Sequence, residues 1–192
     1  MYSKEFNSAF ALLMVSEVGP WFDPTDIGTQ QGLINTAAQR KAVGYVNHPA
    51  DPGGETKFGI AQASHPHVVV KTLTLDQSKE IYYNGYWITA HCDKITSPLN
   101  AMLLDASVNH GTLQATKFLQ TALGLKVDGS WGPQTMNAVM TCKDIKTACS
   151  KYLDARQKFF DKLVVTKPQL AVFKNGWNAR ITMLSAWLLK QT

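Results

Sequence analysis

The stretch "GYVNHPADPGGETKFGIA", residues 44–61, does not have the composition of a packing segment. It contains two prolines, a Gly-Gly pair and several polar or acidic side chains, and then it returns to apolar residues. Loops that only connect elements are usually shorter. Long ordered loops with special backbone residues tend to carry binding or catalytic sites. We therefore expect a functional site in this stretch.

The middle of the stretch is typical of a stiff turn that presents polar groups. Asp51 precedes Pro52, which favours an extended backbone, and Gly53-Gly54 allow a tight reversal. A carboxylate at Asp51 and a hydroxyl at Thr56 could together hold an attacking water. Asp51 could instead form an Asx-turn that only satisfies backbone groups. Glu55 is a competing carboxylate beside the same turn.

A second candidate carboxylate lies at the end of a predicted helix over residues 4–18. Ser3 can cap this helix, and Gly19-Pro20 ends it. Glu17 falls on the apolar stripe, seven residues after Phe10. Burial and the negative end of its own helix would both raise the pKa of Glu17, which suits a general acid. The alternative is a side chain frayed into solvent.

The remaining pattern predicts a mainly α fold with few or no short strands. Helical periodicity and end signals mark further helices from Thr74 through "YYNGYW", after Ser97-Pro98, from Thr112, from Pro133, over 144–165, and over the last apolar segment. The run "VVVKTLTL", residues 68–75, predicts a short strand or an extended segment. We expect a region 1–96 and a region 97–192, packed into one globular unit.

Composition excludes several classes of protein. The chain has 192 residues, 45% of them hydrophobic, and a net charge of +5. No apolar run approaches the ~20 residues of a membrane span, and the N-terminus predicts an amphipathic helix rather than a signal peptide, so we expect no stable membrane insertion. The lysines are scattered, which disfavours nucleic acid. A basic surface suits an anionic partner such as a bacterial wall polymer.

The cysteines and histidines predict neither a disulfide framework nor a metal site. Three cysteines argue against a set of disulfides, and Cys142 and Cys149 would be too far apart to bridge on one continuous helix. We expect free thiols and synthesis in a reducing cytoplasm. His48, His65 and His67 lack the spacing of metal ligands, so we predict no metal and no cofactor.

The whole pattern resembles the N-acetylmuramidases of glycoside hydrolase family 108, found as phage endolysins and related bacterial proteins. The motif at 44–61 carries most of the resemblance. Further agreement comes from "YYNGYW" at 82–87, "LLDASVNHG" at 103–111, "LQTALGLKVDGSWGPQT" at 119–135 and "FKNGWNAR" at 173–180. The segment 113–140 looks like a peptidoglycan-binding module.

The resemblance implies a lysozyme-like helical fold and a set of site residues. Glu17 would protonate the glycosidic oxygen, Asp51 would stabilise positive charge or activate water, and Thr56 would position that water. Candidates for binding the sugar are Tyr45, Asn47, Phe58, Tyr86, Trp87 and Trp131. Trp131 could equally fill the core.

One departure from the family separates Glu17 from Gly44. The family passes almost directly from the glutamate to the Gly-Tyr-Val-Asn segment, whereas this chain inserts residues 18–43. The insertion leaves Glu55 as a fallback for a catalytic role. Trp21 and Phe22 could extend the sugar surface, but we favour packing of the insertion.

The expected function is cleavage of the β-1,4 bond between N-acetylmuramic acid and N-acetylglucosamine in peptidoglycan, for lysis of a bacterial host. The enzyme would be a monomer that waits in the host cytoplasm and acts on the wall after release. A lytic transglycosylase and a non-catalytic wall-binding protein remain alternatives. An amidase would need a histidine-rich zinc site, which the sequence does not provide.

Overall fold

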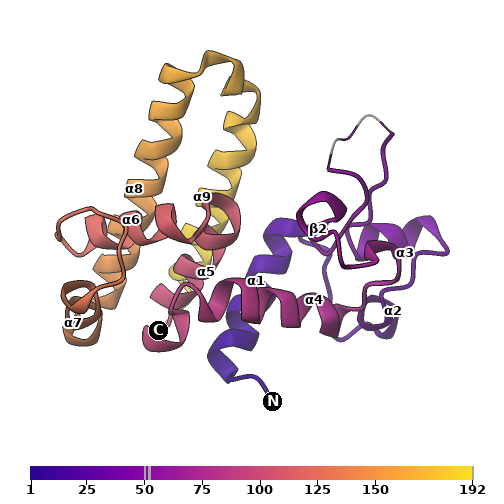
Figure 1. The fold of residues 1–192 in the computed structure, drawn as a ribbon, viewed down its shortest axis with the longest axis horizontal. Coiled ribbons are helices and arrows are strands. Elements are labelled where there is room, and N and C mark those ends of the chain that lie inside the picture. The colour runs from indigo at the N-terminus through magenta and orange to yellow at the C-terminus, as the bar shows by residue number, and fades with distance from the viewer. Residues whose placement is uncertain (50, 52, 192) are drawn as a thin grey trace. The chain divides into compact units, whose positions relative to one another are not determined.

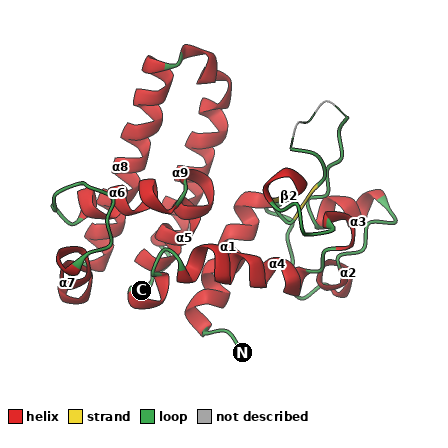
Figure 2. Cartoon of the chain, viewed as in Figure 1, coloured by secondary structure: helices red, strands yellow, loops and turns green. Residues whose placement is uncertain are grey.

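The structure is a computed structural model that describes residues 1–49, 51 and 53–191 (Figure 1). The chain divides into two compact units, Met1–Gly85 and Tyr86–Thr192. The division falls near residue 85, whereas the sequence suggested a boundary just before Ser97-Pro98. Helices dominate both units, so the mainly α, lysozyme-like class expected from the sequence is confirmed (Figure 2).

The first unit begins with helix α1, Lys4–Glu17. The Ser3 hydroxyl accepts a hydrogen bond from the Phe6 N–H at 3.1 Å, which confirms the predicted cap. The apolar stripe with Phe10 and Leu13 is buried, as its helical spacing predicts. Two short helices, α2 (Ile27–Gln31) and α3 (Ala37–Ala42), form inside the inserted segment.

A small antiparallel hairpin follows, formed by β1 (Thr56–Lys57) and β2 (Ile60–Ala61). An isolated bridge pairs Val46 with Thr56, so the chain before the loop also lies against β1. These strands are the only ones in the described residues (Figure 2).

The polypeptide after the hairpin differs from the expectation for residues 68–75. Short 3₁₀ turns form at η1 (Gln62–Ser64) and η2 (Val70–Thr72), and the predicted strand is absent. The Gln62 side chain explains this, because it holds the carbonyl oxygens of His65 and Val68 at 3.2 and 2.7 Å and curls the segment. Helix α4 (Leu75–Tyr82) then starts with the predicted capping box of Thr74 and Gln77.

The second unit is helical throughout its regular structure. The π-helical turn η3 (Tyr83–Ile88) crosses the division between the units, and the 3₁₀ turn η4 (Cys92–Lys94) follows. The later elements are α5 (Leu99–His110), α6 (Thr112–Ala122), α7 (Pro133–Thr141), α8 (Ile145–Thr166), η5 (Pro168–Phe173) and α9 (Lys174–Leu188). Helices α8 and α9 run side by side as a long hairpin (Figure 1). No helix in the described residues is long and apolar enough to cross a bilayer.

The three cysteines are free thiols, as expected. The spacing argument for Cys142 and Cys149 was wrong, however, because Cys142 follows the end of α7 whereas Cys149 lies within α8. They therefore do not share one continuous helix. Burial, with a smaller contribution from Cys142, raises the pKa of the Cys149 thiol to about 12, so that thiol stays protonated at neutral pH.

Candidate functional site

The last residue of α1, Glu17, packs directly against the turn of the hairpin. Gly59 has a φ of +75°, and a Cβ placed on it would lie 2.8 Å from the Cβ of Glu17 and 2.6 Å from the Tyr82 hydroxyl oxygen. Only glycine allows this backbone to approach so closely. The Tyr82 hydroxyl also donates a hydrogen bond to the Phe58 carbonyl oxygen at 2.9 Å. The end of α1 and the hairpin turn are thus held together, and the Glu17 side chain is half-buried between helix and turn.

A second glycine, Gly44, closes the inserted segment back onto the same helix end. Gly44 has a φ of +60°, and a Cβ there would lie 3.3 Å from the Cα of Val18. The inserted segment therefore leaves and re-enters the fold at neighbouring points. Glu17 and the Gly-Tyr-Val-Asn segment are therefore far apart in the sequence but close together in the structure.

The inserted segment is fastened by its aromatic residues. The Trp21 indole N–H donates a hydrogen bond to the Lys41 carbonyl oxygen at 2.8 Å, and the Lys41 ammonium lies 4.5 Å from the Trp21 ring centre. Phe22 is buried. These contacts favour the packing role for both rings, although Trp21 keeps 49% of its surface exposed.

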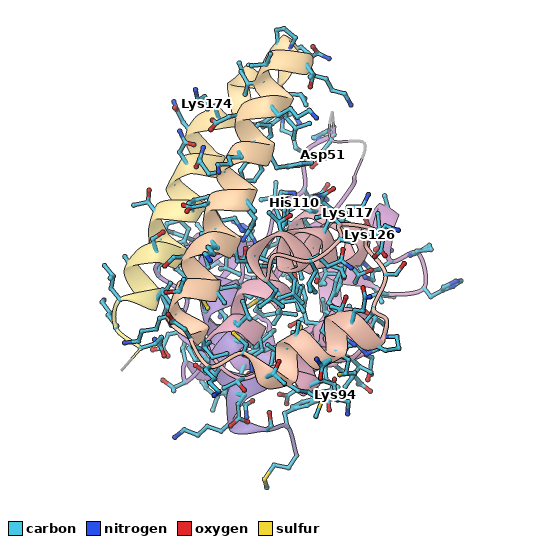
Figure 3. The ribbon with its side chains drawn as sticks, turned by 90° about the vertical axis from the view of Figure 1, so that its left-hand side faces the viewer. Asp51, Lys94, His110, Lys117, Lys126 and Lys174 are labelled. Atoms are coloured by element: carbon cyan, nitrogen blue, oxygen red, sulfur yellow. The ribbon has the colours of Figure 1, made fainter. Side chains whose placement is uncertain are left out.

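Asp51 forms the Asx-turn that its sequence context suggested. Its carboxylate accepts a hydrogen bond from the Gly53 N–H at 2.8 Å, and its carbonyl oxygen accepts one from the Gly54 N–H at 3.0 Å. The residue is exposed on the loop (Figure 3). Pro52 lies outside the described residues. The turn fixes the direction of the carboxylate, which is a requirement for any role in holding water.

Glu55 is the carboxylate that the predicted sugar-binding residues contact. One of its oxygens accepts hydrogen bonds from the Tyr45 hydroxyl and from the Asn47 amide, both at 3.1 Å. Burial, and next the hydrogen bond to Glu55, raise the pKa of Tyr45. Tyr45 therefore remains a protonated donor over the whole neutral range.

Strand alternation divides the candidates between two faces. Val46 is paired with Thr56, and successive side chains of a strand point to opposite faces. Tyr45, Asn47 and Glu55 therefore share one face, and Thr56 lies on the other. Thr56 is half-buried and its backbone N–H and C=O both bond to Val46 at 2.9 Å.

Lys57, which no pattern in the sequence marked as a site residue, is buried in the strand that follows Glu55. Its ammonium donates a hydrogen bond to the Lys71 carbonyl oxygen at 2.8 Å, and its residue is 0% exposed. Burial lowers the pKa of Lys57 to about 8, and the charge of Glu55 opposes that shift. A lysine in a polar motif carried no sequence signal for burial.

Two of the predicted sugar-binding rings are packing residues. Phe58 is 0% exposed with a φ of +51°, and Trp87 is 2% exposed. Neither ring surface is available to a sugar, because both side chains are buried; this corrects the expectation for both. Tyr86 is half-buried.

Trp131 lies in the second unit, stacked on His91 with 4.9 Å between ring centres and 22° between planes. The ring is half-buried, and its indole nitrogen is buried without a hydrogen-bond partner in the described structure. One face of the indole is therefore covered by the imidazole. This arrangement is closer to the packing alternative than to an open stacking platform.

The motif around Trp131 is organised by one buried glutamine. The side-chain oxygen of Gln120 accepts hydrogen bonds from the Asp128 and Gly129 N–H groups at 3.0 and 2.8 Å. Its amide donates to the Asp128 carboxylate, the Ser130 carbonyl oxygen and the Thr135 hydroxyl at 2.8–3.2 Å. The polar residues of "LQTALGLKVDGSWGPQT" are thus used to shape their own loop.

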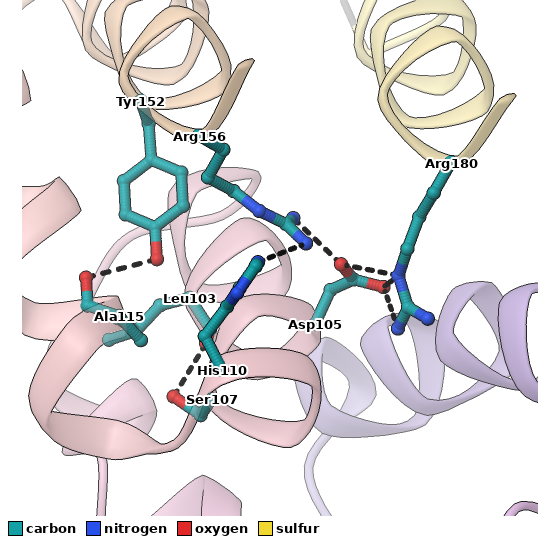
Figure 4. Close-up of polar contacts among 8 residues, drawn as sticks. All are labelled: Leu103, Asp105, Ser107, His110, Ala115, Tyr152, Arg156 and Arg180. Carbon is teal, nitrogen blue, oxygen red and sulfur yellow. Dashed lines mark hydrogen bonds and ion pairs between the residues drawn. The ribbon is translucent and has the colours of Figure 1, made fainter. Parts of the chain in front are cut away.

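A cluster of buried charges lies deeper in the second unit (Figure 4). The Asp105 carboxylate pairs with Arg156 at 2.7 Å and with Arg180 at 2.8 Å, and we call these three residues the charge cluster. Burial acts to raise the pKa of Asp105, but the two guanidinium groups overcome it and hold the pKa below its usual value. Burial, with help from Arg156, lowers the pKa of neighbouring His110 to about 3. The cluster fastens α5, α8 and α9 together.

The first unit also contains a cavity of about 650 Å³ on the side of α4 that carries Gln77, Glu80 and Ile81. Segment 65–73 forms its other wall. Tyr82, which contacts the hairpin turn, is not among the lining residues. Within the described residues, no three His, Cys, Asp or Glu side chains gather in a group that could hold a metal ion.

Two family models match successive parts of the chain. Residues 38–111 match the family model described as Glycosyl hydrolase 108, and residues 114–182 match the one described as Predicted Peptidoglycan domain. A solved structure, SagA of Brucella abortus, is similar with a TM-score of 0.68 and 26% sequence identity, over 96% of this chain and 93% of that one. The comparison with curated proteins found no match.

Proposed function

Since this chain is a peptidoglycan hydrolase, in which a glycosyl hydrolase 108 segment precedes a peptidoglycan domain, we propose that it cleaves the β-1,4 bond after N-acetylmuramic acid with Glu17 as the general acid. The observation that carries this proposal is the close packing of Glu17 on Gly59. It brings the side-chain base of a half-buried glutamate against the turn of the hairpin in the 44–61 motif. Glu17 itself precedes the matched residues, so the packing supplies what the sequence match does not.

The second role in hydrolysis belongs to a carboxylate that stabilises the positively charged sugar or activates water. We assign it to Asp51, whose carboxylate is oriented by the Gly53 N–H. Thr56 is half-buried on the face opposite to Tyr45 and Asn47, so its position does not favour the predicted role in holding the water. Glu55 has a different place in this scheme. Because it accepts hydrogen bonds from Tyr45 and Asn47, it would orient these two side chains toward the sugar.

The biological setting that we propose is lysis of a bacterial host by an endolysin of a bacteriophage. A net charge of +5 would favour association with anionic wall polymers, and its benefit should fall with added salt. The enzyme would act as a monomer on the wall after release from the cytoplasm. Killing of bacteria by the added enzyme, scored against the inactive variant, tests the antimicrobial part of this setting.

The main test is substitution of Glu17 by Gln, assayed by clearing of purified peptidoglycan. We expect a loss of about 10²–10⁴-fold in rate with an unchanged fold, because a general acid contributes that much. Asp51→Asn should also lower kcat, whereas Glu55→Gln should act mainly through KM. If the folded Glu17→Gln enzyme cleared walls at the wild-type rate, the assignment would be wrong.

Product analysis decides the reaction type. Mass spectrometry after reduction should find N-acetylmuramic acid at the new reducing ends. Anhydro-sugar ends would instead establish a lytic transglycosylase, and reducing N-acetylglucosamine would establish cleavage of the other glycosidic bond. Binding to walls without any soluble product would indicate a non-catalytic wall-binding protein.

A further inference from the structure

The turn that joins α8 to α9 exposes large apolar side chains to solvent. Val165 is 79% exposed, Val172 is 77% exposed and Phe173 is 54% exposed. We call residues 165–174 the tip; they form the far end of the α8–α9 hairpin (Figure 1). Adjacent exposed side chains of this size are uncommon on a surface that meets only water.

The tip is an ordered structure rather than a frayed end. The Lys167 N–H bonds to the Leu163 carbonyl oxygen at 2.8 Å, and the Leu170 N–H bonds to the Lys167 carbonyl oxygen at 2.9 Å. Phe173 packs on Trp177 with 6.0 Å between ring centres, and Trp177 stacks on Phe160 at 4.7 Å. The apolar side chains are therefore held outward by a supported turn.

Within the tip, residues 165–174, the charged side chains are Lys167 and Lys174, and both are positive. Just before the tip, Asp161 and Lys162 carry opposite charges, and no Asp or Glu follows Asp161 in the chain. Lys167 and Lys174 are exposed, and neither forms an ion pair in the part of the chain that the structure describes. Lys174 lies along the α8–α9 hairpin, as Figure 3 shows. The tip thus combines apolar side chains with uncompensated positive charge.

We propose that the tip binds the surface of an anionic phospholipid membrane. Val172 and Phe173 would enter the boundary between headgroups and acyl chains, and the lysines would contact the lipid phosphates with their stems along the apolar surface. Each lysine near an anionic surface adds attraction that salt weakens. The attachment is peripheral, which agrees with the lack of a membrane-spanning helix in the described residues.

The chemistry of the tip fits other occupants less well. Sugars are bound in concave sites with converging polar groups, whereas the tip is a turn with aliphatic side chains. A second copy of the chain would bring Lys167 and Lys174 against their own counterparts, and like charges oppose such pairing. An anionic lipid surface satisfies both the apolar and the charged features.

The test is co-sedimentation of the full chain with phosphatidylglycerol vesicles and, in parallel, with phosphatidylcholine vesicles. Binding to the anionic vesicles should be at least about tenfold tighter and should weaken with salt. The double variant Val172→Ser/Phe173→Ser should weaken binding by about tenfold or more. Lys167→Gln/Lys174→Gln should weaken binding to a similar extent and reduce the salt dependence.

Matched controls use exposed side chains elsewhere in the same unit. Met140→Ser, at a position 74% exposed on α7, and Lys126→Gln/Lys143→Gln should leave vesicle binding unchanged. Circular dichroism checks that each variant keeps its helices. Glu17→Gln should bind vesicles like the wild type, so failure of the catalytic assignment would not affect this result.

Three outcomes would overturn the proposal. One is equal binding to the two kinds of vesicle, and another is vesicle binding that the tip variants leave unchanged. The third is a dimer in solution that the tip variants dissociate, because a second copy would then cover the tip.

Discussion

In the second unit the buried Asp105 carboxylate lies between two guanidinium groups, whereas in the first unit the buried Lys57 ammonium donates to a backbone carbonyl oxygen. Pairing holds the pKa of the Asp105 carboxyl below its usual value, so this group stays ionised across the neutral range. For Lys57 the charge of Glu55 opposes the effect of burial only in part, and its pKa falls to about 8. In the second unit the buried charges therefore join helices, whereas in the first unit a buried group within the 44–61 motif has a pKa of about 8.

The largest expected effect comes from removing the shared carboxylate of the charge cluster. Asp105→Asn should destabilise the protein by about 3–5 kcal/mol, because Arg156 would stay buried with its charge unpaired. Chemical denaturation measures the free energy of unfolding. Arg156→Met is the control, and it should cost less because Arg180 still neutralises Asp105. An equal cost for both would mean that the charges act independently.

The next effect is a loss of stability in acid that arises from His110. The folded pKa is about 3 against an ordinary value of 6.5, so between these pH values the unfolded chain binds a proton that the folded chain does not. The free energy of unfolding should fall by on the order of 3 kcal/mol as the pH drops from 6.5 toward 3. His110→Gln should flatten this slope, as followed by denaturation at several pH values. A slope that survives the substitution would assign it to other groups.

A smaller effect should come from the glutamine that shapes the Trp131 loop. Gln120→Ala would leave the Asp128 and Gly129 N–H groups without their acceptor, at a cost of about 1–3 kcal/mol. The exposed Gln134→Ala on α7 is the matched control and should change stability by less than about 0.5 kcal/mol. Melting temperatures compare the two, and equal melting temperatures would contradict a structural role for Gln120.

The smallest effect distinguishes the lone buried lysine from the charge cluster. Between pH 8 and 10.5 the unfolded chain holds a proton on Lys57 that the folded chain has lost, so stability should rise with pH across this window. Lys57→Met should abolish that rise and stabilise the protein at pH 7 by about 1–2 kcal/mol, since no charge is then buried. Destabilisation at pH 7 would show that the bond to Lys71 outweighs the burial of charge.

Sequence reasoning was most successful where a few adjacent residues decide the outcome. The cap at Ser3, the capping box of Thr74 and Gln77 and the helical periodicities each depend on neighbours within one or two turns. It failed for residues 68–75, where a 3₁₀ turn replaced the strand or extended segment that the β-branched run suggested. It also failed for Phe58 and Trp87, which were expected at a sugar surface and are buried.

The amino-acid sequence by itself determined the helical class, the similarity to a glycosyl hydrolase model and a peptidoglycan-domain model, and the motif that contains the candidate site, because these follow from local periodicity and from short-range residue patterns. Only the tertiary structure decided which residues meet. It brought Gly44 and Gly59 against the end of α1, and it joined Asp105 to Arg156 and Arg180, which are 51 and 75 residues away in the chain. Contacts over such separations depend on close approach of backbones and on burial of charge, neither of which leaves a pattern in neighbouring residues.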